Sequence, residues 1–146
     1  MHKSWLLLIV IAGLILPIAA CGGEGAPVAP QPGAVLTGPF EISDKASSGT
    51  ISLTVSADGA SITSVGITLN DLKCDGFSAG SLTKEGGGTF PVADGKIVAS
   101  VSGIGKLDGR FTSPTEASGT IDLILEIPFG GGTCKLGAQN WSAKAG

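Results

Sequence analysis

Apolar and polar side chains alternate along the segment "TISLTVS", residues 50–56. Ile51, Leu53 and Val55 fall on one side of an extended chain, and the serines and threonines between them fall on the other. This period of two predicts an antiparallel strand with one buried face. Asp58 and Gly59 follow closely and predict a hairpin turn, because glycine accepts positive φ without a steric penalty.

The next segment, residues 61–70, returns with the same period. Val65, Ile67 and Leu69 are in phase with one another, whereas Ile62 is out of phase with them. One extra residue in a strand shifts the phase of every side chain that follows it. We therefore expect a β-bulge near Thr63–Ser64.

Short strand-like segments continue toward the C terminus: "FSAGSLT", "GTFPVA", "KIVASVS", "KLDGRFTS", "GTIDLILEI" and "CKLGAQNWSA". Asp-Gly pairs at residues 75–76, 94–95 and 108–109 predict further turns, and glycine runs at 86–88 and 130–132 predict loop tips. No segment of this region carries apolar residues at helical spacing over three turns. The pattern predicts an all-β fold, namely an antiparallel β-sandwich of about eight or nine strands.

The first twenty residues differ in character from the rest. Lys3 supplies a positive charge, and residues 5–20 carry none. This run is marginal for a membrane span, because a helix that crosses a bilayer needs about 20 apolar residues. A basic start, a short apolar segment and small residues at its end are typical of a secretory signal peptide. We expect a signal helix over residues 1–20.

Residues 18–21, "IAAC", resemble the lipobox of bacterial lipoproteins, an aliphatic residue and two small residues followed by a cysteine. The resemblance implies cleavage before Cys21 and lipidation of Cys21 with diacylglyceryl and fatty-acyl (palmitate-type) groups. Two or three acyl chains hold a protein firmly on a membrane, whereas one chain is marginal. The implied location is the bacterial cell envelope, lipid-anchored and extracytoplasmic, in the outer membrane if the cell has two. The alternatives are an ordinary secretory signal and an uncleaved anchor.

Composition divides the remaining chain into a linker and a domain. Residues 22–38 are rich in glycine and proline and lack periodicity, so we expect residues 21–38 to be the lipidated cysteine and a flexible linker. The β-sandwich domain is expected over residues 39–146. The segments "GTISLTVSADG" and "FTSPTEASGT" and the late Cys134 and Trp141 are similar to uncharacterised domains of secreted bacterial proteins. That resemblance implies a β-sandwich and no known activity.

Charge and cysteine content narrow the classes of partner. Once Lys3 is removed with the signal, eight basic residues remain against twelve acidic ones, a net charge of −4. We therefore expect no basic surface for nucleic acid. If Cys21 carries lipid, Cys74 and Cys134 remain in an oxidising compartment, and we expect them to form a disulfide. The alternatives are two unpaired buried cysteines and half of a zinc site.

Candidate catalytic residues are few. The one histidine, His2, lies in the signal, so the mature chain has no imidazole for a serine- or cysteine-based triad. Glu116, Asp122 and Glu126 lie in or near one strand and could serve glycoside hydrolysis. We interpret them as a solvated strand face, because the sequence has no tyrosine to hold a sugar. Phe129 is the best candidate for an exposed aromatic ligand-binding residue.

One cluster of oxygen-bearing side chains is a candidate calcium site. Asn70, Asp71 and Asp75 flank Cys74 in "NDLKCDG". Their spacing is not that of an EF-hand loop, and such residues also favour turns for backbone reasons.

These observations predict a non-enzymatic protein without a cofactor, a binding or envelope-structural module attached to the membrane through Cys21. One alternative is a module that binds carbohydrate or another ligand near Phe129 or the Gly86–Gly88 loop. An enzyme of unfamiliar type that uses the three carboxylates is another. A third is adhesion or assembly through an exposed sheet edge, because the Ser/Thr-rich strands carry few protective charges.

Overall fold

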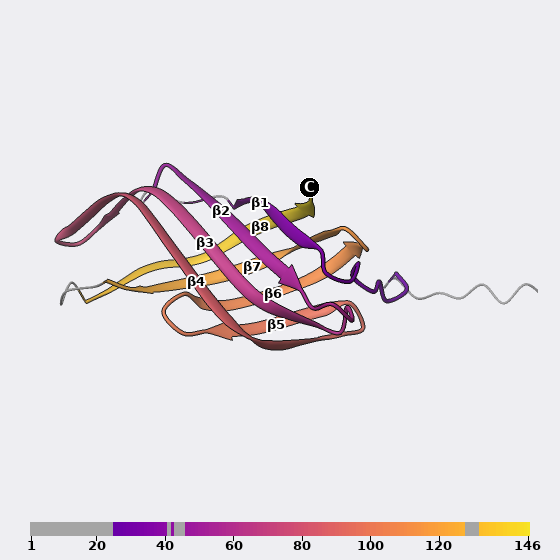
Figure 1. Ribbon diagram of the computed structural model, residues 1–146. Helices are drawn as coiled ribbons and strands as arrows, with labels where there is room; N and C mark the ends of the chain where they lie inside the picture. Colours follow the sequence, from indigo (N-terminus) through magenta and orange to yellow (C-terminus); the bar gives the residue numbers. More distant parts are fainter. Residues whose placement is uncertain (1–24, 41, 43–45, 128–131) are drawn as a thin grey trace, which may run out of the picture.

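The computed structural model describes residues 25–40, 42, 46–127 and 132–146 (Figure 1). These residues form eight β-strands: β1 (Val35–Phe40), β2 (Ser48–Val55), β3 (Ser61–Cys74), β4 (Phe77–Ala93), β5 (Lys96–Val101), β6 (Gly105–Ser113), β7 (Glu116–Glu126) and β8 (Thr133–Ala145). Each strand pairs antiparallel with the next. β1 also pairs antiparallel with β8, which closes the sheet into a barrel.

The predicted all-β class is confirmed, but the predicted β-sandwich is wrong. Two separate sheets would leave the outer strands of each sheet without a partner on one edge. Here β4 pairs with β5 and β1 pairs with β8, so one sheet closes on itself. Alternation cannot separate the two architectures, because each buries one face of every strand. The described residues contain no helix, and the predicted signal helix lies outside them.

Predictions for the hairpin of β2 and β3 are confirmed. The alternate apolar residues of β2 are buried, and the residues between them are more exposed. The pairing between β2 and β3 shifts by one residue at Thr63 of β3, where the phase change predicted a bulge. Gly59 lies in the β2–β3 turn at φ +74, and residues 75–76 and 94–95 also form turns.

Two segments predicted as a loop and a turn lie inside strands instead. Gly86–Gly88 lies within β4, which unites two predicted strands, and the 108–109 pair lies within β6. The cause in each case is close packing. A Cβ on Gly86 would overlap the side chain of Val101, and a Cβ on Gly109 would overlap the indole of Trp141. Glycine therefore serves here to admit a neighbouring side chain rather than to turn the chain.

Apolar side chains from the inner face fill the barrel. The largest fully buried ones are Phe111, Leu36, Ile51, Leu53, Ile62, Ile67, Leu69, Leu72, Ile97, Ile104, Leu107 and Ile121. Trp141 is also buried, at only 3% exposed. β4 differs from the other strands, because none of its 17 residues is fully buried.

The barrel closes through two weakly paired seams. The β4–β5 ladder contains two residue pairs and the β1–β8 ladder contains three, whereas the other ladders contain six or more. A proline lies at each seam, and proline has no N–H to donate to a ladder.

The backbone hydrogen bonds show that each proline faces its seam. The N–H of Val92 donates to the carbonyl of Ala60, which precedes β3. Since successive residues of a strand direct their backbone groups to opposite sides, Pro91 faces β5. By the same argument, the carbonyl of Ala34 accepts from Val55 of β2, so Pro39 faces β8. Each ladder ends or is interrupted where its proline would have to donate.

The chain direction gives the barrel two distinct ends. The start of β1, the C terminus and the turns β2–β3, β4–β5 and β6–β7 lie at one end, which we name the tether end. The last residues of β1, β3, β5 and β7 and the first residues of β2, β4, β6 and β8 lie at the other, which we name the hairpin end. β3 and β4 are the longest strands, and their hairpin projects far out at the hairpin end (Figure 1).

Candidate functional site

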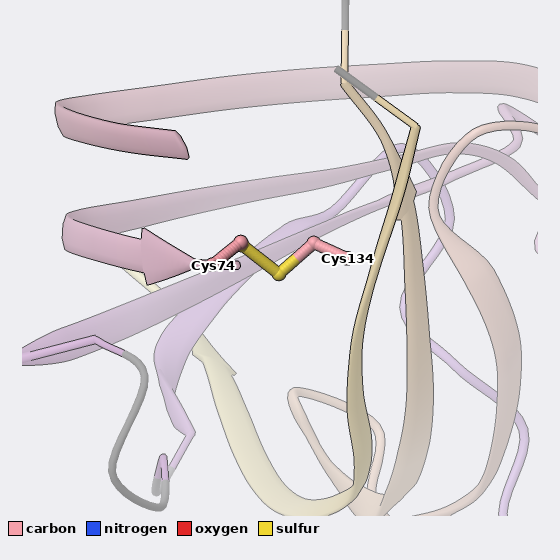
Figure 2. Close-up of a disulfide and its surroundings, with 2 residues drawn as sticks. All are labelled: Cys74 and Cys134. Atoms are coloured by element: carbon pink, nitrogen blue, oxygen red, sulfur yellow. A yellow bond between two sulfur atoms is a disulfide. The ribbon is translucent and has the colours of Figure 1, made fainter. Parts of the chain in front are cut away.

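A disulfide joins the two halves of the chain at the hairpin end. Cys74 ends β3, and Cys134 lies near the start of β8 (Figure 2). Their sulfur atoms are bonded, their Cα atoms are 5.8 Å apart, and 60 residues of sequence separate them. Cys134 is buried and Cys74 is half-buried. The predicted pairing is confirmed. The predicted lipidation residue, Cys21, lies outside the described residues.

Residues 25–34 of the predicted linker lie at the tether end, whereas its last four residues, 35–38, form part of β1. Pro30 is buried, and Val28 packs against the core. The N–H of Gln31 donates to the carbonyl of Pro114 in the β6–β7 turn, at 2.7 Å. A Cβ on Gly95, in the β4–β5 turn, would lie 2.9 Å from the Val28 carbonyl oxygen. The chain therefore meets the barrel several residues before β1 begins.

A hydrogen-bonded carboxylate fixes the β2–β3 turn at the same end. The Ser56 hydroxyl and the Ala60 N–H both donate to the Asp58 carboxylate. These bonds stabilise its charged form, so they hold the pKa of Asp58 below its usual value of 3.8. The side chain thus has a structural role in the turn.

Two of the three calcium candidates are engaged in hydrogen bonds. Asp71 accepts a hydrogen bond from the Ser47 hydroxyl at 2.7 Å, and Asn70 donates to the Ser48 hydroxyl at 2.9 Å. These bonds fix the end of the β1–β2 connection to β3. Asp75 lies in the β3–β4 turn. Within the described ranges, no group of three or more His, Cys, Asp or Glu side chains is placed to hold a metal ion.

The three candidate carboxylates lie on the outside of β7. Glu116, Asp122 and Glu126 are all exposed, and they alternate with buried neighbours. Asp122 and Glu126 are four residues apart, or about 13 Å along a strand, and Glu116 is six residues from Asp122, or about 20 Å. Pairs of catalytic carboxylates in glycoside hydrolases lie about 5–10 Å apart. The structure places these three as a solvated strand face.

Neither of the two predicted ligand-binding positions is seen as an exposed loop site in the described residues. Phe129 lies outside the described residues. The proposed loop at Gly86–Gly88 is part of β4. Open surface depressions occur elsewhere: one of about 530 Å³ lies at the tether end beside residues 25–28, and one of about 430 Å³ crosses the β1–β8 seam near Pro39. Neither carries an exposed aromatic side chain, because Phe111 in the first is buried.

The sequence did not reveal which edge of the sheet is open. β4 pairs with β5 only at Val92 and Ala93, so the edge of β4 from Phe77 to Pro91 has no strand partner on that side among the described residues. Figure 1 shows β4 diverging from β5 toward the hairpin end. The sequence carries one signal of such an opening, Pro91, which lies at a strand position where pairing with β5 would need a backbone N–H.

Comparison of the chain with protein-family models, with curated proteins and with solved structures gives no significant match. Across the part of the chain that the structure describes, no helix is long and apolar enough to cross a membrane.

Proposed function

We propose that this protein is a lipid-anchored, extracytoplasmic β-barrel module with a non-enzymatic binding or envelope-structural role. The observation that carries the proposal is the Cys74–Cys134 disulfide. Disulfides persist in oxidising compartments outside the cytoplasm. The sequence contains three cysteines, so this bond leaves Cys21, at the lipobox-like motif, as the remaining thiol for acylation.

The docked N-terminal segment gives the anchored barrel an orientation. Seven residues of chain lead from Cys21 to Val28, a reach of at most about 25 Å when fully extended. Because Val28 and Pro30 pack at the tether end, that end faces the membrane in this proposal. The hairpin end, with the disulfide and the β3–β4 hairpin, then points away from the lipid.

The proposal is tested by expressing the full chain in a bacterium and measuring the intact mass of the product recovered from membranes. We expect a chain that begins at Cys21 and carries the mass of acyl groups, partitioning into detergent. Cys21→Ser should abolish this modification and release the protein from the membrane. The matched control, Cys74→Ala with Cys134→Ala, also removes cysteines and should remain anchored. An unmodified N terminus, or a retained leader, would contradict the proposal.

The role at the surface is addressed by a second measurement on the same material. Cross-linking the anchored wild-type protein in intact envelopes should capture partners through lysines of the hairpin end, such as Lys73 and Lys135, more than through those of the tether end, such as Lys96 and Lys144. Equal capture at both ends would contradict the proposed orientation.

A further inference from the structure

The open edge of β4 exposes a regular set of backbone groups. The carbonyl of Asn70 accepts the N–H of Ser47, on the β2 side, so the even-numbered residues of this part of β3 face β2. Val65, Ile67 and Leu69 therefore face β4, opposite Gly86, Lys84 and Leu82. The residues that alternate with these on β4 direct their N–H and C=O groups away from β3; they are Ser81, Thr83, Glu85 and Gly87.

These edge positions are suited to strand pairing. None of them is proline, so each has both a donor and an acceptor for a further ladder. Edge strands are usually protected by prolines, charges, bulges or a covering element. On β4 the proline comes at position 91, beyond the stretch 81–87, and the described charges are Lys84 and Glu85.

A row of threonines crosses the outer face of the sheet and ends at this edge. Thr50 of β2 lies opposite Thr68 of β3, which lies opposite Thr83 of β4. The hydroxyl groups of Thr68 and Thr83 are 3.2 Å apart and share a hydrogen bond. Cross-strand threonine pairs stabilise antiparallel sheets. Thr83 is exposed, and the row stops there among the described residues.

We propose that the β4 edges of two copies of this chain pair antiparallel about a two-fold axis at Thr83. Thr83 then lies opposite the second copy's Thr83, and the threonine row continues across both barrels. In this register Ser81 lies opposite Glu85. On the inner face, Lys84 lies opposite Leu82, where the aliphatic stem of the lysine packs on the leucine while its ammonium group reaches solvent.

The charges of the strand fit this register. No like charges face each other, because Glu85 meets a serine and Lys84 meets a leucine. The serine–glutamate contact already has a counterpart within the sheet, where the Ser64 hydroxyl donates to Glu85 at 2.7 Å. A register centred on residue 84 or 85 would instead place Lys84 opposite Lys84, or Glu85 opposite Glu85, and like charges directly opposite are destabilising.

Antiparallel pairing also fixes how the two barrels point. The two-fold axis is perpendicular to the sheet at Thr83, so it reverses every direction that lies in the sheet, the barrel axis included. The two tether ends therefore point in opposite directions. If Cys21 is the anchor, as proposed above, the two copies belong to two facing membranes, and pairing holds those surfaces together.

Cysteine cross-linking tests the register in the chain from residue 21 onward with Cys21→Ser. Residues that face each other in a hydrogen-bonded antiparallel pair have Cα atoms about 5.5 Å apart, within the range that a disulfide spans. Thr83→Cys should therefore give a covalent dimer under mild oxidation. Ser81→Cys is the matched control on the same edge, because its counterpart would lie about 13 Å away along the strand. Equal cross-linking of the two variants, or none for Thr83→Cys, would overturn the register.

Sedimentation of the same chain without added cysteines tests the pairing itself. Thr83→Lys places two ammonium groups together at the axis, whereas Thr68→Lys adds the same charge and loses the same threonine pair one strand away. We expect the dimer dissociation constant to rise about tenfold or more for Thr83→Lys relative to Thr68→Lys, a difference of about 1.4 kcal/mol. A monomeric wild type at high micromolar concentration, or equal effects of the two variants, would overturn the proposal.

Vesicles test the opposed orientation independently of natural acylation. Wild-type protein from residue 21 onward is coupled through Cys21 to phosphatidylcholine vesicles that contain a maleimide lipid. We expect turbidity to rise as vesicles cluster, and Thr83→Lys to reduce the clustering while Thr68→Lys retains it. Cross-linked dimers in solution without clustering of vesicles would overturn the opposed arrangement. Failure of acylation in cells would leave this result unchanged and would overturn only the proposed anchoring.

Discussion

Removing the disulfide should destabilise the barrel by an amount that follows from its position in the sequence. Cys74→Ala together with Cys134→Ala opens a closed loop of about 60 residues. In the chain-entropy treatment, closing such a loop lowers the entropy of the unfolded chain by about 14 cal/mol/K, or about 4 kcal/mol at 25 °C. Domains of this size have total unfolding free energies of about 5–15 kcal/mol. The loss is therefore a large part of the total.

The same change should have a local effect at the hairpin end. The β2–β3 ladder ends at Asn70, so β3 beyond that point pairs only with β4. Residues 71–80 are held to the rest of the barrel by the disulfide, by the Ser47–Asp71 hydrogen bond and by burial of side chains such as Leu72. Without the bond, backbone amides of this hairpin should exchange with solvent faster than those of β6 and β7.

Urea denaturation and hydrogen exchange, both on chains with Cys21→Ser, measure the two effects. Reduced wild-type protein is the control, because it loses the cross-link but keeps both sulfur atoms in place. If the reduced protein and the double variant lose similar free energy, the cross-link is responsible rather than side-chain packing. A loss below about 1 kcal/mol, or unchanged exchange in residues 71–80, would refute the reasoning.

Three further predictions follow from individual residues. Gly119→Ala should lower the unfolding free energy by about 1–3 kcal/mol in urea titrations, because its Cβ would overlap a backbone carbonyl of β6, whereas Gly80→Ala, in open space, should change it by less than about 0.5 kcal/mol. Gly95→Ala and Gly76→Ala both force alanine to φ near +75, but only Gly95→Ala displaces the docked N-terminal segment, so it alone should increase proteolysis of residues 25–33. Asp58→Asn removes a carboxylate whose pKa is lowered by folding. The stability that the wild type gains from this carboxylate is fully present above the unfolded-state pKa of 3.8, and it is lost as the pH falls through the lower folded-state pKa. Unfolding midpoints of wild type and Asp58→Asn should therefore converge below about pH 4, and a constant difference down to pH 2 would contradict this.

Sequence patterns predicted the faces of the strands well and the ends of several strands poorly. The bulge at Thr63 was readable, because a phase change in apolar positions has few other causes. The pairing of Cys74 with Cys134 was also readable from cysteine count and compartment. Glycine was misleading in two places. Gly86 and Gly109 were predicted to lie in a loop and a turn. Each lies in a strand instead, where a side chain distant in the sequence occupies the space that a Cβ would fill. Such contacts depend on tertiary structure, so one sequence cannot separate them from turns.

The closure of the sheet was hidden for a related reason. A sandwich and a barrel differ in whether β4 pairs with β5 and β1 pairs with β8. Here the β4–β5 ladder contains only two residue pairs and the β1–β8 ladder only three. Alternation carries no information on those few pairs. Pro39 and Pro91 lie at the two seams. A proline in a strand indicates only that one backbone N–H is absent, and the sequence does not show which of the two neighbouring strands that N–H would have faced.

Pro91 links the architecture of the barrel to its proposed assembly. A residue with an N–H at this position, facing β5, could extend the β4–β5 ladder beyond Val92 and Ala93 toward the hairpin end. With proline there, the ladder stops, β4 diverges, and the backbone groups of Ser81, Thr83 and Glu85 stay available to another strand. The same feature that weakens the seam thus creates the edge. Restoring the donor with Pro91→Thr should therefore strengthen the seam, seen as slower amide exchange in β5, and weaken pairing between copies. Slower exchange in β5 without any loss of pairing would show that the seam and the edge are independent.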